Sequence, residues 1–207
     1  MYNLVFKRVI DFLVAFLGLL ILSPLFIILT ICLFFSNKGK PFFFQERPGK
    51  GERIFKIIKF KSMNDKKDKN GQLLPDRERL TSLGAFVRKT SLDEIPQLIN
   101  VLKGDMSLIG PRPLLVNYLA YYTDRERLRH TVRPGITGLS QVNCRNNPNW
   151  DDKLKYDVLY VENISLKNDI LIFFKTLVKV LKQKNVTIIP SEKGTTLDKY
   201  RKENINA

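Results

Sequence analysis

The amino-acid sequence predicts a mainly helical α+β protein with an N-terminal membrane helix and a small β-hairpin. Three observations predict this class: an uncharged apolar run near the N-terminus, two β-rich runs around a turn, and helical periodicity in much of the remainder. The chain has 207 residues, which is enough for one domain with a core and a membrane segment. We divide it into a membrane helix (residues 1–36), a main domain (37–189) and a polar tail (190–207).

Residues 12–35 contain no charged side chain. At about 1.5 Å per residue, a helix of about 24 residues can cross the hydrocarbon core of a bilayer. A signal peptide fits less well, because the run is long and no small-x-small cleavage site follows it. Ser23 and Pro24 divide the run into halves that are each too short to cross alone. Proline removes a helix hydrogen bond and bends the helix, and Ser23 can satisfy a freed carbonyl.

Positive charges flank the apolar run on both sides. Lys7 and Arg8 precede it, and the cations that follow it are Lys38, Lys40, Arg47 and Lys50. Positively charged flanks favour the cytoplasmic side, so both ends are drawn to the same face of the membrane. A re-entrant helix satisfies this preference and a straight span does not. Kinked spanning helices are common, so the residues by themselves leave both topologies open.

The segments that follow are interpreted in chain order. Residues 42–47 and 53–61 are expected to form a β-hairpin across a Pro-Gly-Lys-Gly turn, and a polar loop comes next. The helices expected after it are residues 76–89, capped by Asp76, an amphipathic helix from Pro113 to about Arg129, and residues 170–181. The tail past Ile189 is polar and is expected to be loosely held.

Residues 170–181 combine an apolar body with a stripe of lysines at Lys175, Lys179 and Lys182. This pattern is typical of a helix that lies in the plane of lipid headgroups. A helix that packs on the core and turns its lysines to water is the alternative.

The chain carries a formal net charge of +15. A protein this basic is expected to bind nucleic acid, anionic lipid headgroups or phosphorylated substrates. Cys32 and Cys144 form no disulfide framework, and no spaced set of cysteines and histidines indicates zinc. His130 is interpreted as a helix-end residue and not as a catalytic base.

Residues 88–113 carry the most specific signal for chemistry. The adjacent carboxylates Asp93 and Glu94 open a short apolar helix that is expected to end at Gly104. A strand-like stretch then presents Arg112 between two prolines. Acids beside a rigidly held cation suit a site that handles phosphate through a metal ion.

The same acids also have a purely structural interpretation. Ser91 and Glu94 fit a capping box, and Asp93 is an alternative N-cap that places Pro96 where no helix donor is lost. In either case the helix dipole would stabilise the two carboxylates, which are then expected to be ionised at neutral pH.

Four further candidate residues carry weaker signals. Arg88 ends the helix before the acids, where it either binds phosphate or interacts with the helix dipole. Arg133 and Arg145 bracket a loop with two glycines, which is a weak signal for phosphate binding because it lacks the P-loop pattern. Asp157 either supports the arginines from behind or is a solvated helix acid.

Several motifs resemble those of the bacterial sugar transferases, the polyprenol-phosphate phosphoglycosyl transferases. Residues 91–94 and 110–113 resemble the SLDE and GPRP motifs, residues 59–63 a basic motif, and residues 133–142 the motif RPGITGLAQV. Ser140 replaces the usual alanine and Cys144 the usual glycine, while Asp157 and Tyr160 match a closing D-x-x-Y pattern. The resemblance extends from Lys7 to about Leu181, and it is to the small monotopic branch of the family.

The resemblance implies a re-entrant membrane helix and an active site on the cytoplasmic face of the bacterial inner membrane. It implies transfer of a sugar 1-phosphate from a UDP-sugar to polyprenol phosphate, with release of UMP. Asp93 would be the nucleophile and a Mg²⁺ ligand, and Glu94 would assist as metal partner or in proton handling. The residues that would bind phosphate are Lys59, Arg88, Arg112, Arg133 and Arg145, with Asp157 in support.

The expected partners are the UDP-sugar, polyprenol phosphate and inner-membrane lipids, with a second copy of the chain or downstream glycosyltransferases as further partners. With the function that the resemblance implies, nucleic acid is not an expected partner. The competing class is a membrane-tethered basic module that binds anionic lipid or nucleic acid without chemistry. It explains the charge and the apolar helix equally well, but not the ordered acid and arginine motifs.

Overall fold

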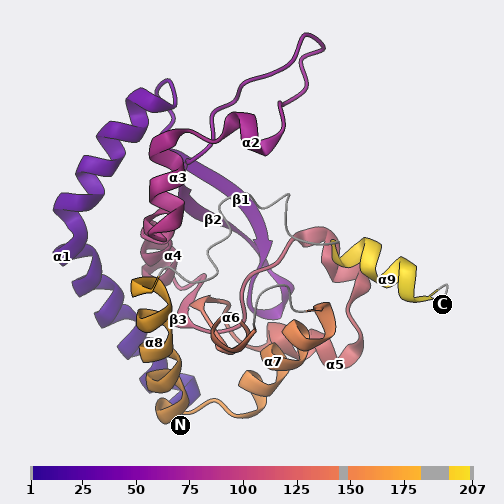
Figure 1. Ribbon diagram of the computed structural model, residues 1–207. Coiled ribbons are helices and arrows are strands. Elements are labelled where there is room, and N and C mark those ends of the chain that lie inside the picture. Colours follow the sequence, from indigo (N-terminus) through magenta and orange to yellow (C-terminus); the bar gives the residue numbers. More distant parts are fainter. Residues whose placement is uncertain (1, 145–148, 183–195, 206–207) are drawn as a thin grey trace.

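The computed structural model describes residues 2–144, 149–182 and 196–205. It is mainly helical with a β-hairpin, as the sequence predicts, and has a second small sheet that was not predicted. The long helix α1 lies along one side of the other elements (Figure 1). The helices of four or more residues are α1 (Lys7–Ser36), α2 (Asp76–Arg79), α3 (Ser82–Lys89), α4 (Gln97–Lys103), α5 (Asp124–Arg127), α6 (Leu139–Asn143), α7 (Trp150–Glu162), α8 (Leu166–Leu181) and α9 (Leu197–Ile205), besides a π-helical turn and several 3₁₀ turns.

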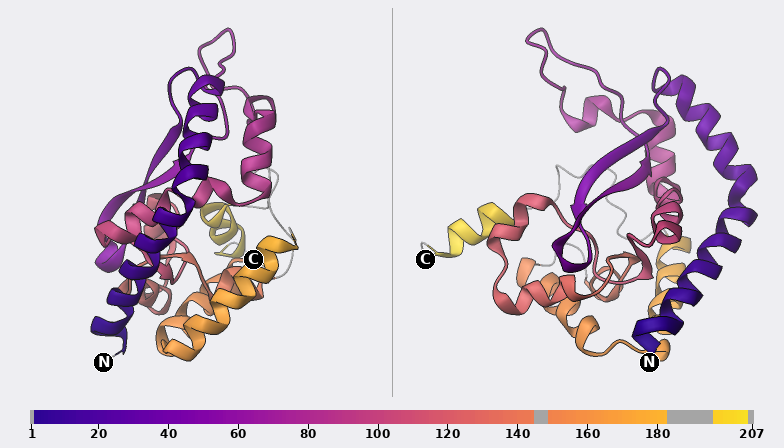
Figure 2. Two further views of the ribbon diagram at one scale, coloured as in Figure 1. Left: turned by 90° about the vertical axis from the view of Figure 1, so that its left-hand side faces the viewer. Right: turned by 180° about the vertical axis from the view of Figure 1, so that it is seen from behind.

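Helix α1 is continuous through Pro24 and bows away from the rest of the molecule (Figures 1 and 2). Proline at position 24 leaves the Leu20 carbonyl without its usual helix donor. The Ser23 hydroxyl donates to this same carbonyl at 2.7 Å, which confirms the role expected for Ser23. Within the described residues, α1 is the one helix long and apolar enough to cross a membrane by length and composition.

Both halves of α1 pack on the main domain. Leu29 and Leu33 in the C-terminal half join a core cluster with Phe60, Val87 and Ile95. In the N-terminal half, the fully buried Ala15 packs in a second cluster, with Ile57, Val101 and Met106. The helix therefore packs against the domain through both of its halves, although many of its large apolar side chains are exposed.

The expected β-hairpin is present as β1 (Phe42–Pro48) and β2 (Ile54–Phe60), paired in antiparallel register with Phe42 opposite Phe60. Gly51 in the turn has φ +64°, a left-handed conformation that glycine adopts without strain. The Asn100 side chain accepts from the Ile58 amide at 3.0 Å and donates to the Lys56 carbonyl at 2.8 Å. This pair of bonds ties α4 to the edge of the hairpin.

The second sheet is a parallel pair, β3 (Ser107–Ile109) and β4 (Gly135–Thr137), with Ser107 opposite Gly135. A Cβ atom at Gly135 or at Gly138 would overlap the backbone of Gly110. Both glycines therefore stand where two stretches of backbone come too close together to admit a side chain.

Two predicted helices are wrong in their extent. Residues 76–89 form two helices, because Leu80 is extended and bridges Met63, and α3 begins again at the N-cap Thr81, whose hydroxyl accepts from Gly84. Asp76 is not a cap, since Pro75 occupies that position.

The helix expected from Pro113 to about Arg129 is instead a 3₁₀ turn (Val116–Tyr121), the short α5 and a second 3₁₀ turn (Leu128–Thr131). Tyr118 and Tyr122 turn inward into a cluster with Leu154. Thr123 then starts α5 with a complete capping box. Tertiary packing and a new cap therefore divide this segment.

Part of the C-terminal tail is held more firmly than the sequence suggests. In α9 the Leu197 side chain is fully buried, beside Tyr118 and Leu154. Arg201 forms ion pairs with Glu126 and Asp151. This part of the tail therefore docks on the main domain.

Candidate active site

Asp93 and Glu94 lie in a 3₁₀ turn (Leu92–Glu94) between α3 and α4. Ser91 is in the left-handed conformation, φ +57°, and its side chain caps nothing, while Pro96 is the N-cap of α4. Both capping interpretations of the acids are therefore wrong. The prediction that α4 ends at Gly104 is confirmed, since this glycine is the C-cap, with φ +91°.

Two cations converge on Glu94 from separate elements. Lys59 of β2 donates from Nζ to Glu94 Oε1 at 2.7 Å, and Arg112 donates from Nη2 to the same oxygen at 3.0 Å. Lys59 Nζ is 4.0 Å from Asp93 Oδ2. The structure therefore brings together four of the candidate residues that the sequence indicated, and it pairs Glu94 more closely than Asp93.

Because the cations pair more closely with Glu94 than with Asp93, the two carboxyl groups have different pKa values. Burial, followed by the neighbouring charge of Glu94, raises the pKa of Asp93 to about 6. Burial also opposes ionisation of Glu94, but the charges of Lys59 and Arg112 outweigh it and lower the pKa of Glu94 to about 2. Adjacent acids whose environments separate their pKa values are a frequent arrangement in active sites. Glu94 is thus a permanent anion, while Asp93 titrates just below neutral pH.

Arg88, at the end of α3, also acts on the acid pair. Its Nε atom donates to the Ser62 hydroxyl at 2.7 Å. Burial lowers the pKa of Arg88, and the charge of Asp93 acts in the opposite direction. Its position at a helix end is as predicted, and its charge opposes the rise in the pKa of Asp93.

The remaining arginine candidates do not join this group in the described part of the chain. Arg133 donates from Nε to the Gly104 carbonyl at 2.8 Å, at the C-terminal end of α4. It lines a separate cavity with Lys7 and Arg8 of α1. Arg145 lies outside the described residues.

Asp157 supports the site through a residue that the sequence did not single out. It is buried, and it accepts from Arg129 Nη2 at 2.7 Å and from the Ser140 hydroxyl at 2.7 Å. Arg129 Nη2 in turn donates to the Arg112 carbonyl at 2.6 Å. Asp157 is therefore no solvated helix acid. It orients Arg129, which holds the backbone that presents Arg112.

Tyr160, the second residue of the D-x-x-Y pattern, supports the same segment. Its hydroxyl donates to the Ile109 carbonyl at 3.0 Å and lies 2.8 Å from Asp169 Oδ1. Burial and the charge of Asp169 raise the pKa of Tyr160, so its proton is retained for this bonding. Ile109 ends β3, three residues before Arg112. Tyr160 therefore holds the backbone at Ile109, and Asp157, through Arg129, holds it at Arg112. The two residues of the D-x-x-Y pattern thus fix both ends of residues 109–112.

A cavity of about 70 Å³ lies next to the acid pair. Its lining residues include Lys59 and Arg112, which also contact Glu94, and two polar residues that the sequence analysis missed, Arg47 of β1 and Gln97 of α4. The only sequence signal for Arg47 was its contribution to the positive flank of the apolar run. Three cations beside a carboxylate pair form a site suited to an anionic group and a nucleophile.

The acid pair also fits a divalent cation. Among the described residues no three His, Cys, Asp or Glu side chains gather into a group that could hold a metal ion. Mg²⁺ is often held by only one or two carboxylates, with substrate phosphates completing the coordination. The raised pKa of Asp93 indicates a carboxylate that lacks full compensation by the cations around it. Asp93 and Glu94 are therefore suited to Mg²⁺ that binds together with a phosphorylated substrate.

Helix α8 turns its apolar side chains outward. Lys179 donates to the Gln141 carbonyl at 2.9 Å and Lys175 to Asn143 Oδ1 at 3.3 Å, so these lysines contact α6. Lys175 and Lys182 are nevertheless exposed, and the buried Ile172 packs in a core cluster, so α8 combines a core contact with an exposed apolar face and both interpretations stay open. The exposed large apolar residues of α8 are Leu166, Ile170, Leu171, Phe173, Phe174, Leu177, Val178, Val180 and Leu181.

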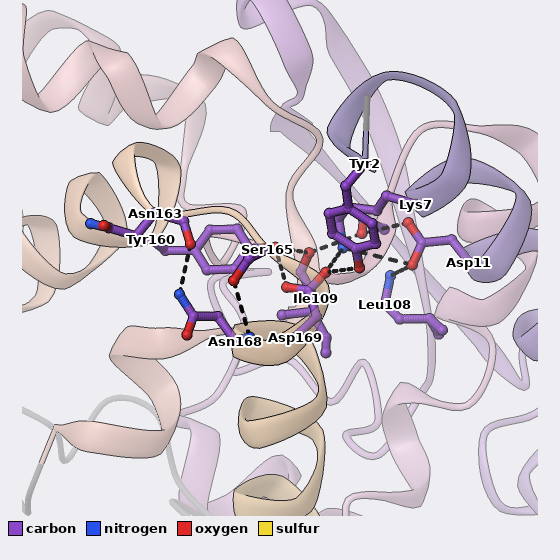
Figure 3. A network of polar contacts seen from close by, with 11 residues as sticks. Tyr2, Lys7, Asp11, Leu108, Ile109, Tyr160, Asn163, Ser165, Asn168 and Asp169 are labelled. Atoms are coloured by element: carbon purple, nitrogen blue, oxygen red, sulfur yellow. Dashed lines mark hydrogen bonds and ion pairs between the residues drawn. The ribbon is translucent and has the colours of Figure 1, made fainter.

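A buried polar network joins the N-terminal end of α1 to α8 and β3 (Figure 3). Lys7 Nζ and the Tyr2 hydroxyl each lie 2.7 Å from Asp169 Oδ2. Asp11 accepts from the Ser107 hydroxyl at 2.6 Å and from the Leu108 amide at 3.2 Å. Since breaking a buried ion pair costs about 3–5 kcal/mol, this end of α1 is firmly fixed to the domain.

The model of the bacterial sugar transferase family matches residues 2–183, so the chain belongs to this family. An uncharacterized sugar transferase of Bacillus subtilis, EpsL, is 47% identical over 179 residues, which are 86% of this chain and 88% of the relative. The chain is 41% identical to UDP-N-acetylgalactosamine-undecaprenyl-phosphate N-acetylgalactosaminephosphotransferase of Aeromonas hydrophila, over 84% of the chain and 43% of the relative. It is 40% identical to undecaprenyl-phosphate galactose phosphotransferase of Salmonella typhimurium, over 86% and 40% respectively. The chain thus spans less than half the length of these two relatives.

Proposed function

We propose that the protein transfers a sugar 1-phosphate from a UDP-sugar to undecaprenyl phosphate, releases UMP, and so starts the assembly of a glycoconjugate at the membrane. The observation that carries this proposal is the acid pair beside a cavity lined by Arg47, Lys59 and Arg112. The activities named for the relatives from Aeromonas and Salmonella support the same reaction class.

The reaction proceeds in two displacements. In the first, an Asp93 carboxylate oxygen forms a bond to the β-phosphorus of the UDP-sugar, and the bond from that phosphorus to the bridging oxygen breaks, so that UMP leaves with the electron pair. In the second, a phosphate oxygen of undecaprenyl phosphate attacks the same phosphorus and releases Asp93. With a pKa of about 6, Asp93 is mostly ionised at neutral pH and more basic than an ordinary aspartate, which favours its attack.

The other residues bind and orient the substrates. Glu94 stays anionic and keeps Lys59 and Arg112 in place, where both cations can contact phosphate oxygens. Arg88 adds a third charge near Asp93. Asp93 and Glu94 would hold Mg²⁺, which neutralises diphosphate charge and improves UMP as a leaving group.

We further propose that α1 is re-entrant and that the site faces the cytoplasm at headgroup height. Its N-terminal end is bound to Asp169 and Ser107, and just past its C-terminal end Asn37 donates to the Lys61 carbonyl at 2.6 Å. If α1 crossed the membrane, its two ends would lie on opposite sides, and a domain on one side could contact only one of them. Contacts between one domain and both ends of α1 therefore favour the re-entrant arrangement. The exposed apolar faces of α1 and α8 provide the lipid contact, and the flanking cations favour the cytoplasmic side.

The test is UMP release from purified protein in lipid vesicles that contain undecaprenyl phosphate, with a panel of UDP-sugars and Mg²⁺. We expect one or more UDP-sugars to yield UMP and a lipid-linked phosphosugar in equal amounts. If none does, while the protein still binds anionic vesicles, it is the membrane-tethered binding module. Asp93→Asn serves as the inactive control, and trapped protein-bound phosphosugar on the unsubstituted protein supports the covalent step.

A further inference from the structure

Two residues that line the cavity beside the acid pair each have a buried donor with no hydrogen-bond partner among the described residues. The donors are Nε of Arg47 and the side-chain nitrogen Nε2 of Gln97. Buried donors are nearly always paired in folded proteins, and each unpaired donor costs roughly 1–3 kcal/mol. Gln97 is only 2% exposed, so bulk water does not satisfy it. Two such donors on residues that line one cavity point to a ligand that completes their bonding.

The charge around Arg47 indicates that this ligand is an anion. Burial, followed by the charge of Arg112, lowers the pKa of Arg47 to about 10. Two other arginines near this site have carboxylate partners: Arg112 pairs with Glu94 and Arg129 with Asp157. Within the described residues Arg47 forms no ion pair, and its Nη2 atom donates to the neutral side chain of Gln45 at 2.6 Å. Arg47 and Arg112 thus line one cavity, and of the two only Arg112 has a carboxylate partner among the described residues.

The geometry of the cavity places the anion next to the proposed nucleophile. Lys59 and Arg112 contact Glu94 and also line the cavity, so the cavity lies directly beside the acid pair. Gln97 is the first residue of α4, three positions after Glu94. The volume of about 70 Å³ is several times the roughly 10–15 Å³ that one water molecule needs. A phosphate group bearing several acceptor oxygens matches this space and these donors.

We propose that Arg47 and Gln97 bind phosphate oxygens of a substrate in this cavity. The identity of the substrate rests on the proposed function, which offers two sources of the same chemistry: the UMP portion of the donor and the phosphate of the lipid acceptor. Arg47 supplies a charged fork that suits phosphate, and the Gln97 amide supplies a neutral donor beside it.

Arg47→Met and Gln97→Met test the proposal, because methionine approximates each side chain in length and carries no donor. Arg53→Met is the matched control, since Arg53 is on the same hairpin, is exposed, and its loss removes the same charge. Binding of inorganic phosphate and of UMP to the full chain in nanodiscs is measured by calorimetry. We expect Arg47→Met to weaken binding roughly tenfold or more and Gln97→Met about three- to tenfold, with Arg53→Met within about twofold of the unsubstituted protein.

Stability provides a second readout that separates binding from folding. Replacing a buried, unpaired donor with an apolar group of similar shape is neutral or stabilising. Gln97→Met should therefore unfold at the same or a higher denaturant concentration while it binds phosphate less well. If both substitutions leave phosphate binding, UMP binding and the KM values for donor and acceptor unchanged, the proposal is wrong. If Gln97→Met lowers the free energy of unfolding by the amount expected for a broken hydrogen bond, the proposal is wrong for Gln97 as well.

The arms of the experiment identify the phosphate and keep the two proposals apart. Weaker UMP binding in the variants assigns the cavity to the donor, whereas unchanged UMP binding with a raised KM for undecaprenyl phosphate assigns it to the acceptor. If the unsubstituted protein binds phosphate through Arg47 and Gln97 but transfers no sugar phosphate, the proposed function fails and this inference stands. If the unsubstituted protein transfers sugar phosphate, and Arg47→Met and Gln97→Met bind phosphate and UMP as well as the control Arg53→Met does, the proposed function stands and this inference fails.

Discussion

The buried pair of Arg129 and Asp157 allows stability and catalysis to be separated. Their side chains are 1% and 4% exposed, and Asp157 accepts two hydrogen bonds from Arg129 and one from Ser140. Asp157→Leu leaves a buried guanidinium without its counter-charge, which is expected to cost about 3–5 kcal/mol of unfolding free energy. It also frees Arg129 to move away from the Arg112 carbonyl, so we expect catalysis to fall as well.

A triple variant then separates the two effects. Combining Asp157→Leu with Arg129→Met and Ser140→Ala replaces the whole polar group with apolar side chains, which is often neutral or even stabilising. We expect stability to return to within about 2 kcal/mol of the unsubstituted protein, while UMP release stays low because the Arg112 carbonyl has lost its donor.

The assays are guanidinium unfolding followed by circular dichroism in one detergent, and initial rates of UMP release. Two results would refute the reasoning. A cost below about 1 kcal/mol for Asp157→Leu would mean that the ion pair is solvated. Full activity in the triple variant would mean that Arg129 does not position Arg112. Arg125→Met is the control, because that side chain is 76% exposed and its ion pair with Glu162 is expected to contribute little.

Four further predictions concern the acid pair, Arg112 and the membrane helix. Asp93→Asn should abolish UMP release, and unchanged turnover would show that Asp93 is not the nucleophile. The same substitution should raise the free energy of unfolding at neutral pH by up to about 3 kcal/mol, because a carboxyl group whose pKa is raised to about 6 is costly to ionise in the folded protein. The single-turnover rate of UMP release should fall as the pH drops through about 6, where Asp93 gains its proton. Glu94, whose pKa is lowered to about 2, should not contribute to the change between pH 5 and pH 7. A rate that is constant over that range would show that ionised Asp93 is not required. Arg112→Ala should raise the KM for the UDP-sugar about tenfold or more with the fold intact by circular dichroism, and Arg112→Lys should restore it only in part, since a point charge cannot bind phosphate through two parallel bonds; complete rescue by lysine would contradict this. In a Cys32→Ser, Cys144→Ser background, Asn3→Cys should resist a membrane-impermeant maleimide in intact cells and react after lysis; reaction from outside would show that α1 spans the membrane.

Much of the local structure could be predicted from the sequence, because it depends on neighbouring residues. The apolar run with its central proline, the hairpin turn at Gly51 and the end of α4 at Gly104 follow from side-chain chemistry and backbone preferences over a few positions. The bond from Ser23 to the carbonyl that Pro24 frees is of the same kind. The ordered acid and arginine motifs likewise indicated the family before any contact was known.

Tertiary structure decided what these residues contact. No local pattern reveals that Ser91 takes the left-handed conformation, that Arg129 reaches the Arg112 carbonyl, or that Lys179 of α8 bonds to α6. These features depend on segments far apart in the chain, whose approach is set by burial of apolar surface and by the need to pair buried polar groups. The same need, left unmet at Arg47 and Gln97, is visible only once the cavity between β1 and α4 has formed. The sequence by itself therefore determined the chemical groups of the site, and the folded chain determined their partners and their pKa values.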